Sequence, residues 1–363
     1  MTAAADRALA WATLAQKSFD ARTLAALLRE IPDPVALLNA SRAQLMRIAP
    51  ERTIARLTAP LPEAREALTR AWLADPAHEL IAWDDPDYPR TLLDLQDAPP
   101  AFFFVGRRDL LNAPALAIVG SRNATPAGVE NAHAFAHALS DAGLTIVSGL
   151  ALGIDGAAHE GGLEGPGSTI AVCATGLDRV YPARHRALAH RIASNGALVS
   201  EYPPGTPPVK ENFPRRNRLI SGLSKGVLVV EATLSSGSLI TAKLAGEQSR
   251  DVFAIPGSIH SPFSKGCHKL IREGAKLVET AEDVLTELQI EASGPTVRTS
   301  RAPVAIPPEA AAVLEALGHD PADTDALVRR THMGADAVAA ALIALELAGR
   351  VVALPGGCWQ RAD

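Results

Sequence analysis

The chain has 363 residues and a mass of 38.0 kDa, which is too long for one compact core, so we expect two or three domains. Hydrophobic residues make up 47% and charged residues 21%, values that are ordinary for a soluble folded protein and exclude a mostly disordered chain. The formal net charge is −5, from 35 Lys and Arg against 40 Asp and Glu. As an average, this charge argues against a nucleic-acid partner and favours a cytosolic enzyme, but an average conceals any local basic patch.

The cysteines and the hydropathy pattern set further bounds. Cys173, Cys267 and Cys358 are odd in number and far apart, so neither a disulfide framework nor a metal site is predicted. Asp6 and Arg7 precede any apolar run, which argues against a signal peptide. No stretch of about 18 uncharged apolar residues predicts a membrane span. We therefore expect a cytoplasmic protein with no resident metal.

Residues 1–77 have the pattern of an N-terminal helical domain. Leucines recur at helix spacing over 24–28, and Ser41 is suited to cap a helix over 42–48. Helix pairs of this size occur in helix-hairpin-helix modules, which hold DNA phosphates on glycine-rich hairpins. The break at 31–34 carries two prolines and no glycine, so we interpret this domain as a packing module.

Residues 78–287 alternate short β-branched runs with longer helical patterns. Continuous apolar strands separated by helices indicate a parallel sheet that is covered on both faces. We therefore predict an α/β fold built on an extended Rossmann-like parallel sheet. Its predicted strands cover 116–119, 144–147, 169–172, 198–199, 227–230 and 252–255.

The C-terminal part shows a different pattern. Residues 288–307 lose periodicity and contain several prolines, so they are predicted to be a linker. Residues 308–363 hold three helical patterns, followed by two short β runs around a Pro-Gly-Gly turn. Three helices and a β-ribbon predict a C-terminal winged helix.

Four predicted strands are followed by clusters of glycine and small polar residues. Ligands of an open parallel sheet bind in the crevice at the carboxyl ends of its strands. Glycine lets an anion approach the main chain, and helix N-termini present free N–H groups to it. A single cluster of this kind is equally explained by packing. The prediction of a ligand site therefore rests on the presence of four such clusters. They predict a phosphate-binding floor at Gly120, Ser121, Arg122, Ser148, Gly149, Gly153, Gly176, Ser236, Gly237 and Ser238.

The common nucleotide fingerprints are missing from these clusters. No GxGxxG motif is followed by an acidic residue at the end of the next strand, which argues against a dinucleotide site. No GxxxxGK[ST] motif is present either, which argues against a P-loop NTPase. We therefore expect no cofactor.

A basic segment follows the fourth predicted strand. Its nine residues, 210–218, carry a charge of +3 in a chain whose mean charge is negative. Arginine binds phosphate in a bidentate manner, and an aromatic ring stacks on a base. The alternative is a solvated basic turn before a helix, with Asn217 as a cap and Arg218 as a packing residue. The candidates for DNA contact are Lys210, Phe213, Arg215, Arg216, Asn217 and Arg218.

Catalytic constellations are sparse. Asp155 and His159 are spaced at i and i+4 near a helix start, and we interpret them as a structural pair. No nucleophile-elbow motif places a serine beside them. The residues therefore favour a binding protein over an enzyme.

Blocks of the middle region share their order and spacing with a known family. They are AIVGSR at 117–122, SGLALGID at 148–155, GLD at 176–178, SEYPPG at 200–205, FPRRNRLISGL at 213–223, SSGSLITA at 235–242, FAIPG at 253–257 and GCHKLI at 266–271. Together they closely resemble the DNA-processing protein A (DprA/Smf) family. The match is dense over about residues 85–285 and loose in the flanking domains.

The resemblance implies an extended Rossmann fold that binds single-stranded DNA in a basic, glycine-lined pocket. It also implies a homodimer that protects incoming DNA and loads the RecA recombinase onto it during natural transformation, without being an enzyme. By the resemblance, Arg122, Lys210, Arg215 and Arg218 belong to the DNA pocket. It also places His268 and Leu277 at or near the dimer interface.

An enzyme remains the alternative from another class. Nucleoside-monophosphate phosphoribohydrolases bind phosphate on a similar fold and use a glycine-rich turn with a catalytic Glu. Here the corresponding turn at 235–242 is followed by Lys243, and Glu247 comes one turn later. The carboxylate that would carry out hydrolysis is absent from its place, which argues against this reading.

The predicted winged helix is acidic. Residues 302–363 contain four basic and eight acidic residues, and the expected recognition helix over 335–348 has no Lys or Arg. A helix that reads the major groove needs cations and base-reading side chains. We therefore expect this unit to serve protein contact or packing. Without its charge of −4, the rest of the chain carries −1, so the chain average does not exclude a nucleic-acid partner.

Overall fold

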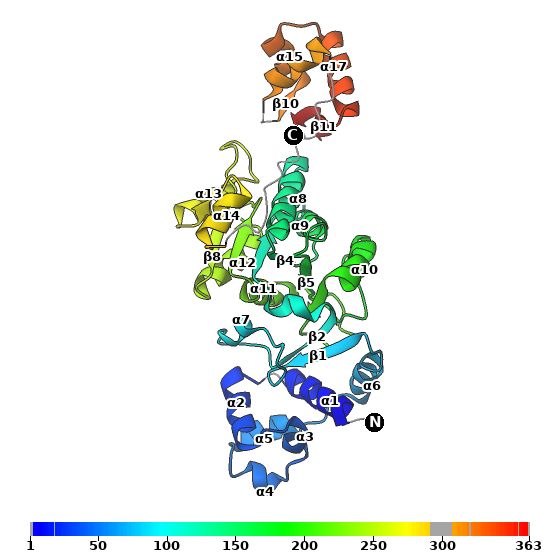
Figure 1. Cartoon of the computed structure of the whole chain (residues 1–363), viewed down its shortest axis with the longest axis vertical. Helices are drawn as coiled ribbons and strands as arrows, with labels where there is room; N and C mark the ends of the chain where they lie inside the picture. The colour runs from blue at the N-terminus through cyan, green and yellow to red at the C-terminus, as the bar shows by residue number, and fades with distance from the viewer. Residues whose placement is uncertain (1–2, 18, 291–306, 319–320, 355, 362–363) are drawn as a thin grey trace.

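The N-terminal part of the chain is helical, as predicted (Figure 1). The structure, a computed structural model, describes residues 3–17, 19–290, 307–318, 321–354 and 356–361. Ser41 caps a helix through a capping box with Gln44, as predicted, and Asp20 and Asp33 cap two others. The helices are α1 (Ala3–Gln16), α2 (Ala21–Glu30), α3 (Pro34–Asn39), α4 (Arg42–Leu45), α5 (Glu51–Thr58) and α6 (Glu63–Trp72).

A nine-stranded sheet follows, in the order β1-β2-β6-β5-β4-β3-β7-β8-β9. The strands from β6 to β9 in this order run parallel, whereas β1 and β2 add two antiparallel strands at one end. The bounds are β1 (His78–Ala82), β2 (Ala101–Gly106), β3 (Ala115–Val119), β4 (Thr145–Ser148), β5 (Thr169–Val172), β6 (Ala197–Ser200), β7 (Gly226–Val229), β8 (Asp251–Ala254) and β9 (Lys276–Leu277).

The sheet confirms the predicted α/β class, and six strands lie within one residue of their predicted positions. The strands that the sequence pattern did not reveal are β1, β2 and β9. In β2, Phe102, Phe103 and Phe104 are all buried, because both faces of this strand are covered. Trp72 of α6 packs edge-on against Phe103, with ring centroids 5.5 Å apart. The N-terminal helices therefore pack directly on the antiparallel end of the sheet.

Helices cover both faces of the sheet, as expected for a doubly wound fold. One apolar core joins the sheet to α7, α11, α12 and α13, and cores on the opposite face join it to α8, α9, α10 and α14. Their bounds are α7 (Arg90–Leu93), α8 (Pro126–Asp141), α9 (Ile154–Gly162), α10 (Arg186–Asn195), α11 (Asn212–Gly222), α12 (Ser238–Glu247), α13 (Lys265–Arg272) and α14 (Ala281–Glu287), with 3-10 turns at Arg108–Asn112 and Ala183–His185.

The C-terminal unit is a winged helix, as predicted. Its strands form a separate sheet in the order β10-β12-β11, and it has its own apolar core around Leu314 and Leu342. Most of the predicted linker, residues 291–306, lies outside the described residues. The elements are α15 (Pro308–Leu317), β10 (Ala322–Asp323), α16 (Thr324–Thr331), α17 (Ala335–Leu347), β11 (Val351–Leu354) and β12 (Cys358–Arg361).

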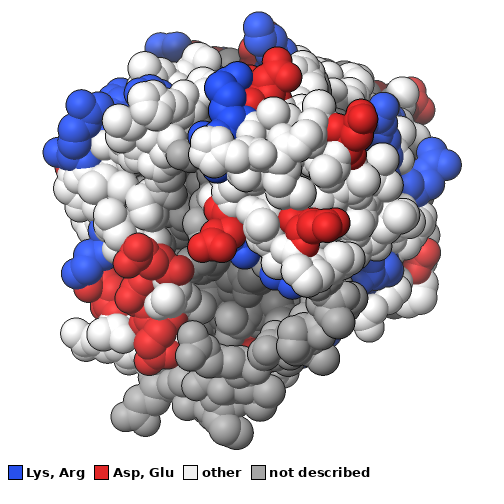
Figure 2. All heavy atoms as spheres, turned by 90° about the horizontal axis from the view of Figure 1, so that it is seen from above, with Lys and Arg blue, Asp and Glu red and all other residues white. Residues whose placement is uncertain are grey.

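Charge is unevenly arranged on the face seen from the winged-helix end. Figure 2 shows Lys and Arg scattered among uncharged residues on the described part of that face, with several Asp and Glu gathered at one side. Over the described ranges, no helix is long and apolar enough to cross a membrane. The same ranges hold no group of three or more His, Cys, Asp or Glu placed to bind a metal ion.

Candidate nucleic-acid interface

A cavity of about 420 Å³ lies at the carboxyl ends of the central strands. Its walls are the loops after β3, β4 and β7, one face of α11 and the first turn of α12. Strand β3 has β4 on one side and β7 on the other, so the strand order reverses there, and such a switch point is where doubly wound sheets bind ligands. The cavity brings together nine predicted residues: Gly120, Ser121, Arg122, Phe213, Arg216, Asn217, Ser236, Gly237 and Ser238.

The N-terminus of α12 forms one wall of the cavity and is suited to an anion. Ser238, the first residue of this ten-residue helix, is 7% exposed, and its Oγ has no hydrogen-bond partner among the described residues. A buried hydroxyl without a partner costs about 1–3 kcal/mol. The positive end of the helix dipole lies at the same place. A phosphate oxygen bound here would accept the Ser238 hydroxyl proton and lie in the favourable field of the helix.

Arg122 lies beside an aromatic pair at the cavity. Its guanidinium carbon is 5.4 Å from the centroid of the Phe213 ring, a cation–π contact. The Phe213 ring also meets Tyr181, with centroids 5.6 Å apart and an angle of 57° between the planes. Arg122 is exposed and Tyr181 is 48% exposed. The arrangement combines a positioned cation with ring surfaces on which bases can stack.

Arg216 has a different environment from Arg122, because its side chain is buried under the cavity. Its Nη1 donates to the carbonyl oxygen of Gly149 at 2.7 Å and to that of Val172. It thereby ties the carboxyl ends of β4 and β5 to α11. Burial lowers the pKa of Arg216, and the nearby carboxylate of Asp155 opposes that effect. Its Nε has no partner among the described residues.

The predicted glycines serve packing more than exposure of the main chain. A Cβ on Gly149 would lie 2.5 Å from Arg216 Nη1, so only glycine leaves room for the guanidinium. Gly153 has φ of +76° and approaches the Ser121 carbonyl oxygen, which a Cβ would meet at 2.3 Å. Cβ atoms on Gly120 and Gly176 would likewise meet protein atoms. At Gly237 a Cβ would meet no described atom within 4 Å, so its main chain is open to a ligand.

Asp155 and His159 form the predicted structural support under the cavity. Asp155 Oδ2 accepts the N–H groups of Gly149 at 3.1 Å and Ala151 at 3.3 Å. The N–H of Leu150 donates to Nε2 of His159. The other ring nitrogen of His159, Nδ1, lies 2.7 Å from the Thr169 hydroxyl. Burial raises the pKa of Asp155 and lowers the pKa of His159 to about 3, so the imidazole is neutral.

The remaining predicted residues do not line the cavity. The Ser148 hydroxyl donates to the Ile118 carbonyl oxygen inside the sheet, at 2.6 Å. Arg218 forms ion pairs with Glu201 and, at 3.0 Å, with Asp97. Arg215 faces another hollow, and Lys210 is exposed just before α11.

The sequence left open that residues 210–218 form a solvated basic turn before a helix, and this alternative is wrong for most of the segment. Residues 212–222 are already helical, so Asn217 lies inside α11 and is not its cap. Arg218 is nevertheless a packing residue, as that alternative held, because its side chain is 12% exposed within its ion pairs.

Two residues at the site were missed by the sequence reasoning. Glu231, just after β7, accepts hydrogen bonds from the Thr125 N–H at 2.9 Å and the Thr125 hydroxyl at 2.6 Å, which fixes the loop that carries Arg122. Burial raises the pKa of Glu231. A carboxylate directly after a strand at the switch point was the available signal. Tyr181 gave no signal until its contact with Phe213 was visible.

The two residues expected at a dimer interface lie near the β9 end of the sheet. Leu277 of β9 is 46% exposed. His268 of α13 is half-buried, and its Nε2 lies 3.0 Å from the Gly257 carbonyl oxygen. Their place at an interface stays a prediction.

The fold defines a Rossmann-like protein with a cavity at the switch point of its sheet and a C-terminal winged helix. The chain matches the family described as DNA recombination-mediator protein A over residues 79–289, and the DprA winged helix domain over residues 297–357. The chain therefore belongs to the DNA recombination-mediator protein A (DprA/Smf) family, which confirms the resemblance seen in its sequence.

Individual relatives agree with this assignment. The chain is 44% identical to Protein Smf of Escherichia coli over 295 residues, covering 79% of this chain and 78% of the relative. It is 49% identical to the DNA processing protein DprA of Streptococcus pneumoniae over 205 residues, covering 56% of this chain and 72% of the relative.

Solved structures show the same fold. The X-ray structure of DprA from Streptococcus pneumoniae superposes with a TM-score of 0.64 at 38% identity, covering 76% of this chain and 95% of that one. DNA processing protein A from Helicobacter pylori superposes with a TM-score of 0.54 at 32% identity, covering 58% and 95%. That structure was described for its single-stranded DNA binding mode.

Proposed function

We propose that this chain is a recombination mediator that binds single-stranded DNA in the cavity at the switch point. The observation that carries the proposal is the pairing, in one cavity, of an exposed arginine on an aromatic ring with a helix N-terminus that holds an unpartnered buried hydroxyl. Phosphates would lie between Arg122 and Ser238, and bases would stack on Phe213 and Tyr181. The Helicobacter pylori relative, described for binding single-stranded DNA, supports the choice of ligand.

The test is fluorescence anisotropy with single- and double-stranded oligonucleotides across a salt series. Single strands should bind more tightly, and coverage of about 4–6 phosphates would give a log–log salt slope of about −3 to −4. Arg122→Ala should weaken binding about tenfold and equally for all sequences. The matched control is Arg52→Ala, since Arg52 is exposed on α5, outside the cavity, and makes no ion pair with a described residue. A flat salt response, or equal affinities of the two variants, would remove the cavity from the proposal.

We propose the biological role that the resemblance to the family implies. The bound strand is incoming DNA, which the protein protects from nucleases and onto which it loads the RecA recombinase during natural transformation in the cytoplasm. The test is whether the wild type, but not Arg122→Ala, speeds RecA assembly on DNA coated with single-strand-binding protein. Equal RecA assembly with both proteins would contradict the loading role.

The proposal contains no catalytic step. Among the described residues, Asp155 supplies the carboxylate in the cavity lining, and it is engaged by two N–H groups and lies near Arg216. Glu247, one turn beyond the place of the hydrolytic carboxylate, pairs with Lys243 at 3.6 Å on α12 and lies outside the cavity. Incubation with AMP should release no adenine, and adenine release would establish the phosphoribohydrolase alternative.

We further propose that the protein is a homodimer that pairs through the β9 end of the sheet. An exposed leucine on a short edge strand supports this choice of surface. Leu277→Asp should shift the sedimentation coefficient to that of a monomer, whereas Leu347→Asp, on the 86% exposed leucine of the winged helix, should not. A dimer that survives Leu277→Asp would place the interface elsewhere.

A further inference from the structure

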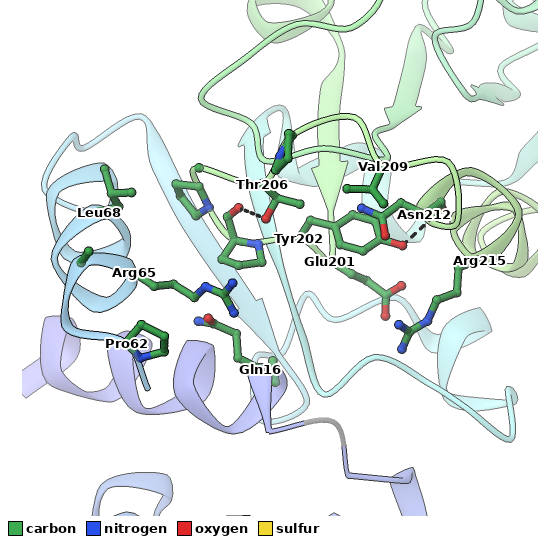
Figure 3. Close-up of a pocket in the computed structure, with 16 residues that line it drawn as sticks. Gln16, Pro62, Arg65, Leu68, Glu201, Tyr202, Thr206, Val209, Asn212 and Arg215 are labelled. Carbon is green, nitrogen blue, oxygen red and sulfur yellow. Dashed lines mark hydrogen bonds between the residues drawn. The ribbon is translucent and has the colours of Figure 1, made fainter. Parts of the chain in front are cut away.

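A second hollow, of about 580 Å³, lies beside the first turn of α11 (Figure 3). Its walls come from two parts of the chain that are far apart in sequence. One wall is built from α1 and α6 of the N-terminal helices, and the other from the loop after β6 and the start of α11. We call this hollow the interdomain groove.

The interdomain groove carries excess positive charge. Arg65 of α6 reaches into it from one wall and Arg215 of α11 from the opposite wall (Figure 3). Neither forms an ion pair with a described residue, and both are exposed. The acid that lines the groove, Glu201, is already paired with Arg218. Arg215 lies in the field of Glu201 without a direct ion pair. Both arginines therefore keep guanidinium groups available to a phosphate-bearing ligand.

Other lining groups suit a nucleic-acid base. Gln16 Oε1 is buried and has no hydrogen-bond partner among the described residues, so it is free to accept from an exocyclic amine. The ring of Tyr202 is fixed by a bond from its hydroxyl to the Asn212 carbonyl oxygen at 3.2 Å. Leu68 is 52% exposed and adds an apolar surface. An anion site, an unpartnered acceptor and apolar walls together match a nucleotide.

Helix α11 connects the interdomain groove to the cavity. Phe213, Arg216 and Asn217 line the cavity, whereas Asn212 and Arg215 line the groove. Helix geometry accounts for this division, because successive side chains are rotated by about 100° around the helix axis and so face different hollows. The two hollows therefore flank α11 on neighbouring faces of the helix.

We propose that the interdomain groove binds a further segment of the same single strand, with Arg65 and Arg215 contacting its phosphates. This inference rests on the proposed binding of single-stranded DNA in the cavity, and it assigns the N-terminal helical domain a direct part in binding. The strand passes from the cavity around the first turn of α11 into the groove.

The test measures affinity for two lengths of oligonucleotide, about 5 and about 20 nucleotides, chosen around the size of known single-strand sites. With the longer oligonucleotide, Arg65→Ala should bind about fivefold more weakly than wild type. Its negative log–log salt slope should become less steep by about 0.7, because one phosphate contact is lost. With the shorter one, of which fewer nucleotides reach the groove, the loss of affinity in Arg65→Ala should be clearly smaller than fivefold. The control is again Arg52→Ala, which should match wild type at both lengths.

The outcomes separate the two proposals. If Arg122→Ala weakens binding while Arg65→Ala matches Arg52→Ala at both lengths, the groove inference is overturned and the cavity stands. If Arg122→Ala has no effect at either length, the proposed function itself fails. Circular dichroism of each variant checks that the helices remain folded.

Discussion

The main chain of Gly149 lies directly against the guanidinium of Arg216, so that a Cβ at Gly149 would be 2.5 Å from Nη1. Gly149→Ala should therefore overpack the site and lower the free energy of unfolding by about 1–3 kcal/mol, measured by urea denaturation. Gly237→Ala is the matched control, because Gly237 has φ of −64° and open space where the Cβ would go. Equal midpoints for the two variants would contradict this account of Gly149.

Arg216 should matter for stability, in contrast to Arg122. Arg216→Met leaves the Gly149 and Val172 carbonyls without their donor and Asp155 without its nearby cation. The expected cost is about 3–5 kcal/mol, seen as a lowered Tm. Arg122→Ala, on an exposed side chain, should leave the free energy of unfolding within about 0.5 kcal/mol of wild type. A Tm of Arg216→Met equal to that of wild type would show that the guanidinium is dispensable.

The ring of Phe213 is expected to position Arg122. Phe213→Leu keeps an apolar side chain but removes the ring under the guanidinium and the contact with Tyr181. Affinity for single-stranded DNA should fall about five- to tenfold, since both the positioned cation and a stacking surface are lost. In the double-mutant cycle with Arg122→Ala, the two losses should be less than additive. Full additivity in anisotropy titrations would mean that the two side chains act independently.

His159 should make stability depend on pH. Its pKa is about 3 in the folded chain and about 6.5 when unfolded, so between these values the unfolded chain binds the extra proton. The free energy of unfolding should therefore decrease as pH falls from about 6.5, by about 1.4 kcal/mol per pH unit.

The measurement for His159 is urea denaturation at several pH values below neutrality, for wild type and His159→Gln. Burial raises the pKa of Asp155, Glu201 and Glu231, and this acts in the opposite direction in both proteins. The difference between the two pH profiles isolates His159. Parallel profiles would mean that the pKa of His159 is not lowered in the folded protein.

The winged helix should contribute little to DNA affinity. Helix α17 carries Asp336 and Glu346 and no Lys or Arg. Removal of residues 302–363 should leave affinity for single strands within about twofold, because the unit adds no phosphate contacts from that helix. Duplex affinity should be equally unchanged in anisotropy titrations. A tenfold loss for either ligand would assign this unit a direct part in binding.

The sequence predicted the parallel strands well because each is a continuous apolar run bounded by turn residues. Strands β1 and β2 were missed because their antiparallel pairing lies outside the alternation of strands and helices that defines the rest. The caps at Ser41 and the three helices of the winged helix were also predictable, since local side chains define them.

The site was less predictable at the level of single residues. Arg215, Arg216 and Arg218 look alike in sequence, yet one faces the interdomain groove, one is buried below the cavity and one is ion-paired. The direction of each arginine side chain depends on where α11 begins. The helix begins at Asn212, well before Asn217, which the sequence had suggested as a cap. Gly120, Gly149, Gly153 and Gly176 were predicted for contact with a ligand, but they pack against neighbouring side chains and carbonyls that become visible only in three dimensions.

Helix α11 separates two hollows, and this has a mechanical consequence for any strand that occupies both. A strand that runs from the cavity to the interdomain groove has to make a corner at Phe213 and Pro214. Neighbouring bases cannot remain stacked on one another around such a corner, so the ones at the bend would be splayed apart. The protein would then hold DNA with its backbone clamped on both sides and a few bases turned outward, ready to pair with a complementary strand.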